Sequence, residues 1–384
     1  MDLKASSRLG VPQLINLARV DLPVFSVGSI QCCQYFLEVI SSTIRMIVMQ
    51  KVHIGYFIPE FPGQTHAFFW QERKVLSELG VQSDWLSTRC PPQGIISHIW
   101  ASKAKQETLY LVPFTVFDWF NSLVEILHAG PGKWINCLSV IFLSPDTGLL
   151  EKFKLLTLIV FSGKLIWLWR KKDWDHIHVH SCGNAANIAL FASILSGLTY
   201  SMTLHGPTLE TYGNNQKQKW KHSTFALVVS DKLLNDVSVK LKGFLPKTVI
   251  SVPMGVNLSE VSRKSQYTPW EEGAQCKLFA CGRLNPIKGH SFLFKSVEIL
   301  KNRGLDVSLK VAGEDEQGGQ GYHKYLQELI QEMNLDDCIE LLGAVSQERV
   351  RKLLGIQTAL VQSTQKPCSK GFTEVSMQFR CSTA

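Results

Sequence analysis

The chain has 384 residues, of which 45% are apolar and 19% are charged. This balance excludes a largely disordered protein and leaves room for about two domains. The formal net charge of +8 favours anionic partners such as nucleotides, phosphates or an acidic membrane surface. The 10 cysteines show neither a zinc-binding spacing nor the framework of a disulfide-rich secreted protein, so we expect a reducing cytosol.

The first 48 residues differ from the rest of the chain, because they show no steady helical or strand period. A signal peptide is not expected, since Gln31, Gln34 and Glu38 interrupt the apolar run from 24 to 40. Met46 and Met49 stand just before the first strong strand. We therefore expect residues 1–48 to be an N-terminal extension, either disordered or translated from an upstream start.

Strands and helices alternate along the rest of the chain. Strands are predicted at 52–58, 176–181, 199–206, 225–230 and 248–255, with helices at 66–79, 184–197 and 231–243. A second series has strands at 277–284, 307–313, 339–345 and 358–363. This order predicts an α/β protein with two Rossmann-like, doubly wound domains, 49–257 and 258–363. Ligands of such sheets bind at the carboxyl ends of the strands, so we expect a cleft between the domains.

The segment 148–174 is apolar but is interrupted by Lys164, and it ends in Arg170, Lys171 and Lys172 beside tryptophans. Its uninterrupted run is shorter than the roughly 20 residues of a spanning helix. Two interpretations remain, a buried helix of the first domain and a helix that lies in a membrane interface. We favour the buried helix and keep peripheral membrane contact as a hypothesis.

His176, His178 and His180 alternate along one predicted strand and therefore share one face. Such spacing occurs in metal sites, which makes a zinc- or manganese-dependent hydrolase one alternative. No second group of ligands accompanies these histidines in the sequence. Asp173 and Asp175 precede the strand and are interpreted as charges at a helix end. We predict that no metal is bound.

The residues with the clearest chemistry stand where predicted strands end. His205 closes the strand at 199–206, and Arg283 and Lys288 lie between a strand and a helix, where two fixed cations can hold a diphosphate. Each has a structural alternative when it is taken alone: His205 can be a histidine that caps a strand, and Arg283 and Lys288 can be surface cations near a turn. Strand ends with glycines that allow a ligand close to the backbone include Gly255, Gly282 and Gly313, the last followed by Glu314.

The chain resembles the family-4 retaining glycosyltransferases of the GT-B fold over about residues 50–361. The resemblance rests on segments in family order: PEFPGQTHAF, HIHVHS, SMTLHG, SVPMGVN, CGRLNPIKGH, LKVAGED and IELLGAV. The first of these is similar to exopolysaccharide or colanic-acid-type members. No nucleic-acid partner is expected, because the cations are dispersed.

The resemblance implies transfer of a sugar, with retention and without a metal or other cofactor, from a UDP- or GDP-type nucleotide sugar to a glycan or lipid-linked acceptor. It implies that His205 contacts the donor sugar and that Arg283 and Lys288 hold the diphosphate and stabilise its departure. Gly63, Gly255, Gly282, Gly313 and Glu314 are assigned to the donor site. The expected location is the cytoplasm or the inner face of the membrane.

The end of the chain departs from the family pattern. Where the family continues with a glycine-containing loop and two glutamates, this chain ends as STQKPCSKGFTEVSMQFRCSTA, with Glu374 as its one carboxylate. We expect a C-terminally truncated second domain, an aberrant tail at 364–384 and an exposed apolar strand edge at 358–361. A non-catalytic remnant with residual binding is therefore a further hypothesis.

Overall fold

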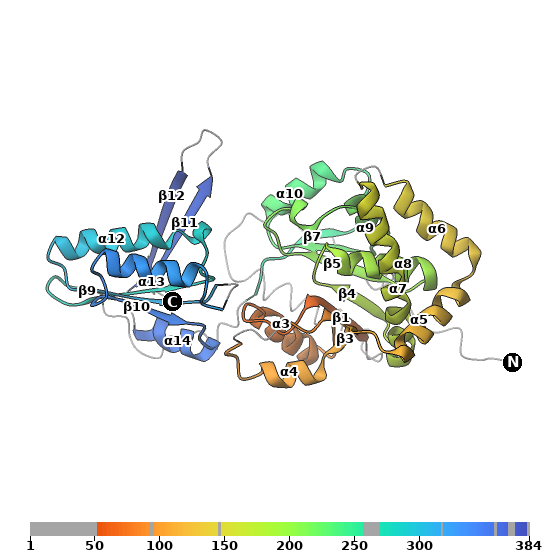
Figure 1. Ribbon diagram of the computed structural model, residues 1–384, viewed down its shortest axis with the longest axis horizontal. Helices are drawn as coiled ribbons and strands as arrows, with labels where there is room; N and C mark the ends of the chain where they lie inside the picture. Colours follow the sequence, from red (N-terminus) through yellow and green to blue (C-terminus); the bar gives the residue numbers. More distant parts are fainter. Residues whose placement is uncertain are drawn as a thin grey trace. The chain divides into compact units, whose positions relative to one another are not determined.

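The structure is a computed structural model that describes residues 52–91, 96–144, 147–255, 269–315, 318–356, 359–367 and 373–381. The chain forms two compact units. The first ends at Gly255, and the second follows it and also includes the segments Pro62–Ala67 and Pro91–Lys103. Each unit is built around its own sheet (Figure 1). The extension predicted at 1–48 lies outside the described residues.

The first unit contains a seven-stranded sheet in the order β3-β2-β1-β4-β5-β6-β7. Its strands are β1 (His53–Glu60), β2 (Gln82–Arg89), β3 (Leu109–Val112), β4 (His176–Val179), β5 (Tyr200–Leu204), β6 (Ala226–Val228) and β7 (Val249–Ser251). All neighbouring strands are parallel, so their carboxyl ends share one edge of the sheet. The five strands predicted for this half are confirmed, whereas β2 and β3 escaped the sequence analysis.

The helices that lie wholly or mostly in the first unit are α3 (Ala67–Glu78), α4 (Ala101–Glu107), α5 (Val116–Ala129), α6 (Pro131–Phe142), α7 (Leu149–Lys172), α8 (Asn184–Ser196), α9 (Gln216–His222) and α10 (Asp231–Lys240), with a short 3-10 helix, η1 (Glu210–Tyr212). Helix α8 is apolar on all sides because it packs between the sheet and other helices. It contacts β1, β4 and β5 on one side and α6 and α7 on the other.

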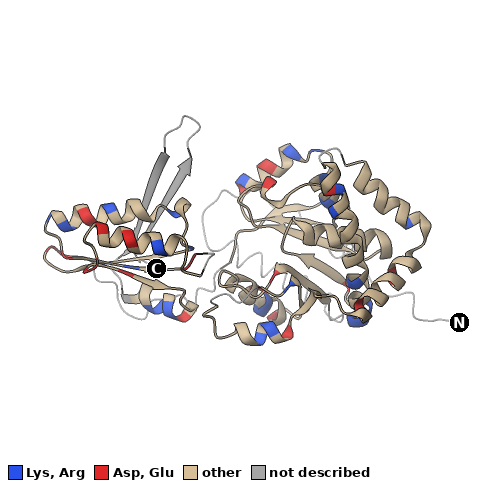
Figure 2. Cartoon of the chain, viewed as in Figure 1, with Lys and Arg blue, Asp and Glu red and all other residues tan. Residues whose placement is uncertain are grey.

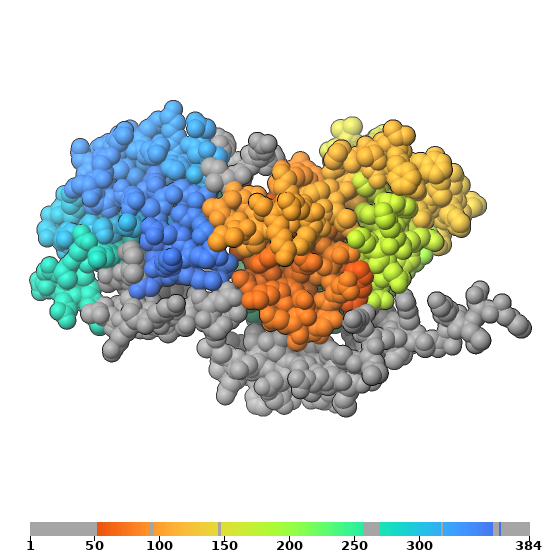
Figure 3. All heavy atoms as spheres, turned by 90° about the horizontal axis from the view of Figure 1, so that it is seen from below, coloured from red at the N-terminus to blue at the C-terminus, as the bar shows by residue number. Residues whose placement is uncertain are grey.

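The two faces of the central strands differ in chemistry. Phe57, Ile177 and Val179 belong to the large apolar core with α8. Residues next to them in the chain point to the opposite face, where Tyr56 of β1 stacks near His180 and Phe69 of α3. Figure 3 shows α3, in deep orange, on the outer surface of this unit. The histidines of β4 therefore lie between the sheet and α3.

The second half of helix α7 follows the buried-helix interpretation of segment 148–174, whereas Leu149, Leu150 and Phe153 in its first turns are exposed. Lys164, which interrupts the apolar run, is almost fully buried and pairs with Asp118 of α5 at 3.0 Å. It also donates a hydrogen bond of 2.9 Å to the carbonyl oxygen of Leu111. Arg170 pairs with Glu125 at 3.1 Å. Among the described residues, no helix has both the length and the apolar character needed to cross a bilayer.

The second unit contains a five-stranded sheet in the order β10-β9-β8-β11-β12. Its elements are β8 (Cys276–Cys281), η2 (Pro286–Lys288), α12 (His290–Asn302), β9 (Val307–Ala312), α13 (Tyr322–Glu332), β10 (Ile339–Gly343), α14 (Gln347–Ile356), β11 (Ala359–Pro367) and β12 (Thr373–Cys381). Leu278, Phe294, Val297 and Leu309 are central to its apolar core. Acidic and basic residues are interspersed along α12 and α13 (Figure 2).

The expectation of an exposed apolar strand edge at 358–361 is wrong for the described residues of this segment, 359–361. Strand β11 pairs with β8 on one side, through Ala359 and Leu360. On the other side it pairs antiparallel with β12, from Ala359↔Cys381 to Pro367↔Thr373. Strand β12 therefore covers this edge of β11. The alternation of Val375, Met377 and Phe379 with polar residues is the strand pattern that the sequence analysis overlooked.

Candidate functional site

In the second unit, the turn after β8 carries two cations at the start of α12. The Asn285 side chain accepts a hydrogen bond from the backbone N–H of Lys288. Gly289, with φ of 63°, then turns the chain into the helix. Arg283 and Lys288 are both exposed and flank this turn. Backbone N–H groups at a helix start together with two cations form a favourable place for an anion.

Backbone contacts between glycines hold this turn against its neighbours. Gly313 has a φ of 157°, and a Cβ added there would lie 1.8 Å from the carbonyl oxygen of Gly282. The N–H of Gly282 donates to Ala312, and the N–H of Gly313 donates to Gly343. The ends of β8, β9 and β10 are thereby joined. The structure thus brings together Gly282, Arg283, Gly313 and the following residue, Glu314, as the sequence analysis grouped them.

Glu314 and Asp315 anchor the Gly-rich loop that precedes α13. Glu314 Oε1 lies 2.8 Å from His323 Nδ1 and accepts a 3.0 Å bond from the N–H of Asp315. The Asp315 carboxylate accepts from the N–H groups of Gly319, Gly321 and His323, at 2.8, 3.0 and 2.9 Å. Asp315 and His323 were missed. An Asp ahead of a Gly-rich run and a helix was the available signal, because its carboxylate can satisfy helix N-terminal N–H groups.

A buried, neutral histidine directly follows the turn that carries Arg283 and Lys288. His290, the first residue of α12, is 4% exposed. Burial lowers its pKa to about 4, and the charge of Lys288 acts in the same direction, while a hydrogen bond with the Asn285 backbone opposes both. The centroid of its ring lies 6.1 Å from that of Tyr322, with the two ring planes inclined at 57°. The sequence analysis missed this residue, and nothing in its pattern distinguishes it from a surface histidine.

In the first unit, His205 directly follows β5 and is half-buried. Its Nε2 lies 3.2 Å from Nδ1 of His180, and the two rings are stacked with centroids 5.4 Å apart. Phe68 and Phe69 of α3 also contact the His205 ring. His205 is thus held from two sides at the carboxyl edge of the sheet.

The three histidines of the HIHVHS segment do not converge on one point. His176 bonds to Thr199 and Ser201 at 2.7 and 2.8 Å. His178 bonds to Ser201 and Thr203 at the same two distances. Burial lowers the pKa of both histidines to about 3, so both rings are neutral at physiological pH.

The residues that come closest to a metal site differ from the three histidines that the sequence suggested. Glu72, His178 and His180 offer ligand atoms within 4.8 Å of one another. An ion at usual Zn–N distances of about 2.0–2.1 Å needs these atoms closer together. Because both ring nitrogens of His178 already make hydrogen bonds, one of these bonds must also break. This geometry gives the hydrolase alternative little support.

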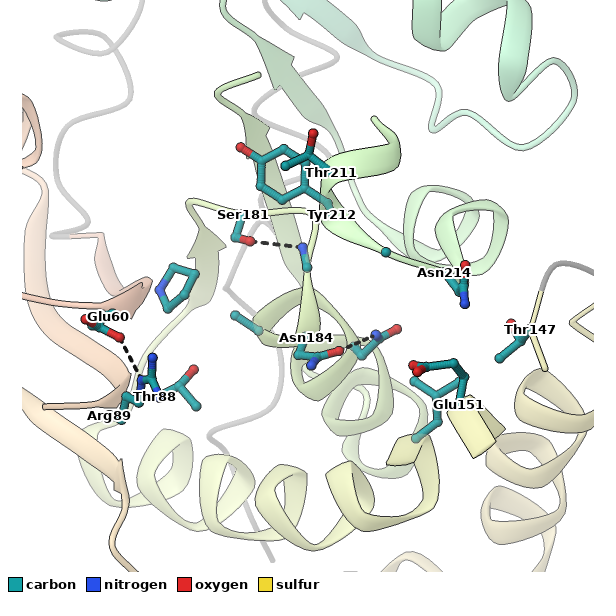
Figure 4. Close-up of a pocket in the computed structure, with 16 residues that line it drawn as sticks. Glu60, Thr88, Arg89, Thr147, Glu151, Ser181, Asn184, Thr211, Tyr212 and Asn214 are labelled. Carbon is teal, nitrogen blue, oxygen red and sulfur yellow. Dashed lines mark hydrogen bonds and ion pairs between the residues drawn. The ribbon is translucent and has the colours of Figure 1, made fainter. Parts of the chain in front are cut away.

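A second feature of the first unit is a cavity of about 570 Å³ next to the start of α8 (Figure 4). Hydroxyl and amide groups line it, from Thr88, Ser181, Asn184, Thr211, Tyr212 and Asn214. Glu60 and Arg89 form an ion pair of 2.7 Å on its wall. Groups of this kind can hydrogen-bond the hydroxyls of a sugar. The sequence analysis missed this cavity, since its residues come from five separate segments.

The remaining predicted donor residues lie in loops. Gly63 follows β1, and a Cβ at this position would lie 2.7 Å from Nδ1 of His66. Gly255 follows β7 and is exposed, with open space where a Cβ would stand. Their contacts with a donor stay predictions.

Comparisons with known proteins bear on this arrangement. The profile of the family described as glycosyl transferases group 1 matches residues 270–375. The chain carries a glycosyltransferase domain. No curated protein sequence gives a significant match to this chain.

Three solved structures that are similar to this chain show its fold. A glycosyltransferase from Rickettsia africae has a TM-score of 0.54 at 14% identity, covering 82% of this chain and 74% of that one. HepE of Anabaena, in complex with UDP and glucose, has a TM-score of 0.54 at 12% identity, covering 81% of this chain and 74% of that one. Sucrose-phosphate synthase from Thermosynechococcus elongatus has a TM-score of 0.52 at 15% identity, covering 80% of this chain and 74% of that one. The chain has the GT-B fold, as predicted.

Proposed function

We propose that this chain is a family-4 retaining glycosyltransferase of the exopolysaccharide type. It moves a sugar from a nucleoside diphosphate to a glycan or lipid-linked acceptor, in the cytoplasm or at the inner face of the membrane. The observation that carries the proposal is the close approach of Gly313 to Gly282, beside the turn that carries Arg283 and Lys288 into α12.

The proposed chemistry depends on stabilising the departing diphosphate. When the bond to the sugar breaks, negative charge grows on the phosphate oxygens. Arg283 offers a planar pair of N–H donors and Lys288 a compact charge. Preorganised cations and helix N–H groups lower such a barrier without reorganising. In this scheme no metal is required, and a phosphate oxygen receives the proton of the acceptor hydroxyl.

The first unit supplies the other two parts of the proposal. His205 contacts the donor sugar, supported by its fixed place after β5. The hydroxyl-lined cavity near α8 receives the acceptor. HepE, which is similar in fold, was solved with UDP and glucose, so UDP-glucose is the first donor to test, with GDP-mannose as the alternative nucleotide.

The test is turnover by the full chain with these donors, with and without EDTA. We expect release of the nucleoside diphosphate and, by proton NMR, an α-configured product from the α-configured donor. Replacing Arg283 with Ala should abolish release, whereas Arg303→Ala, an exposed cation at the end of α12, should leave it unchanged. Donor binding without turnover would support the non-catalytic remnant instead. Loss of activity with EDTA, or product of inverted configuration, would contradict the mechanism.

A further inference from the structure

Three side chains lead from helix α3 to His205. Glu72 lies on α3, His180 directly follows β4, and His205 directly follows β5. His180 Nδ1 and His205 Nε2 are 3.2 Å apart, and His180 Nε2 lies 3.8 Å from Oε1 of Glu72. His180 therefore stands between a carboxyl group and the histidine to which we assign contact with the donor sugar.

The second ring nitrogen of His180 is in an unusual position. The side chain is fully buried, against the rings of Tyr56 at 4.1 Å and Phe69 at 4.9 Å. Its Nε2 has no hydrogen-bond partner in the structure, although buried polar atoms normally have one. The distance to Glu72 is too long for a hydrogen bond but short enough for a strong electrostatic influence.

The protons of the two rings are linked. A neutral imidazole carries one proton, so one nitrogen donates and the other accepts. When His180 carries its proton on Nδ1, His205 Nε2 accepts it and the His205 proton is on Nδ1. When His180 carries its proton on Nε2, the bond reverses: His205 Nε2 donates, and His205 Nδ1 becomes an acceptor.

We propose that Glu72 and His180 set the tautomer of His205, and thereby decide whether that ring donates or accepts a hydrogen bond at the donor sugar. Ionised Glu72 attracts the His180 proton to Nε2, which leaves His205 Nδ1 as an acceptor. Neutral Glu72 removes this attraction, and after a small side-chain rotation its hydroxyl donates to His180 Nε2. His205 Nδ1 then carries a proton and donates. The inference rests on the proposed function only for the ligand that His205 meets.

The surroundings of Glu72 make its charge variable near neutral pH. Partial burial raises its pKa to about 7, although the neighbouring Tyr56 hydroxyl opposes the shift and 40% of the Glu72 side chain remains exposed. The groups that face it are Tyr56 from β1, whose own pKa is raised well above its usual value, and two histidines from β4, His178 and His180. Burial lowers the pKa of both histidines, so they remain neutral while Glu72 titrates.

A further charged group, on the same helix, is turned elsewhere. Arg73 bonds to Ser83 and pairs with Glu107. The titration of Glu72 therefore changes the charge next to His180. Below about pH 7 His205 Nδ1 is a donor, and above it an acceptor.

The experiment is long-range ¹H–¹⁵N NMR of the full chain labelled at histidine nitrogens, from pH 5.5 to 8.5 without ligand. His205→Gln assigns the signal. We expect the His205 tautomer to change with a midpoint near pH 7. In Glu72→Gln the midpoint should disappear from this range. Glu78→Gln, an exposed carboxylate at the end of the same helix, should behave as the native chain. His180→Phe, checked for folding by its amide spectrum, should also remove the midpoint.

The outcomes separate the inference from the proposed function. A tautomer change that depends on Glu72 supports the relay even if no nucleotide sugar binds, in which case the proposed function fails alone. One His205 tautomer throughout the pH range overturns the relay. Stoichiometric binding of added Zn²⁺ that shifts the signals of His178 and His180 also overturns it, because the ion would occupy the nitrogen that the relay needs.

Discussion

Gly313 lies so close to Gly282 that a single added carbon at residue 313 would stand 1.8 Å from the Gly282 carbonyl oxygen. This contact joins the ends of β8 and β9, next to Arg283. Replacing Gly313 with Ala should therefore lower the free energy of unfolding by about 2–4 kcal/mol, through clash and backbone strain, and should weaken donor binding. Urea unfolding measures the first effect. Gly355→Ala in α14, where a Cβ meets open space, should instead stabilise by about 0.5–1 kcal/mol.

Asp315 should be important for the loop although it is not in the predicted site. Asp315→Ala removes the acceptor of three backbone N–H groups and should cost about 2 kcal/mol of stability. Amide hydrogen exchange at 318–323 should accelerate. The exposed Asp336 is the matched control, with a change within about 0.5 kcal/mol on Asp336→Ala. Equal effects of the two substitutions would contradict the anchoring role.

Loss of the buried ion pair between Lys164 and Asp118 should lower stability far more than loss of an exposed ion pair. Lys164→Met leaves the Asp118 carboxylate buried without its cation and should destabilise the first unit by about 3–5 kcal/mol. Lys154→Met removes an exposed pair with Glu151 and should change stability by less than about 1 kcal/mol. Thermal unfolding of both variants beside the native chain makes the comparison.

Stability should fall with decreasing pH because of the β4 histidines. His176 and His178 have pKa values lowered to about 3 by burial, so the unfolded chain binds protons below about pH 6.5 that the native chain refuses. Each histidine should then cost about 1.4 kcal/mol per pH unit between about pH 6 and 4. Urea titrations across this range should show a shallower slope for His178→Gln. An unchanged slope would mean that these rings are protonated in the folded chain.

The sequence predicted the alternating architecture well, because buried parallel strands such as Phe57 and its neighbours are continuous apolar runs. It failed where an element is exposed or short. Strand β2 mixes Ser83, Asp84 and Trp85 and has no clear period. Lys164 looked like an interruption, since its partner Asp118 lies in a helix that the pattern did not reveal.

The candidate site was predictable only in part, for a physical reason. Arg283 and Lys288 follow a strand and a glycine, which local sequence can show. The roles of Glu314 with His323 and of His180 with His205 depend on distances between separate elements. The cavity near α8 likewise forms only when five separate segments come together, so no single segment predicts it.

The most direct test of the account is calorimetric titration of the full chain with UDP and with GDP. We expect one of them to bind with 1:1 stoichiometry. The double variant Arg283→Ala, Lys288→Ala should bind it at least about 100-fold more weakly, because each charge-assisted contact contributes about 1.5–3 kcal/mol. The control is a second double variant, Arg303→Ala with Lys295→Ala, which removes two exposed cations from the same unit. It should bind the nucleotide as the native chain does. Absence of binding by the native chain, or equal affinity of the two double variants, would contradict the account.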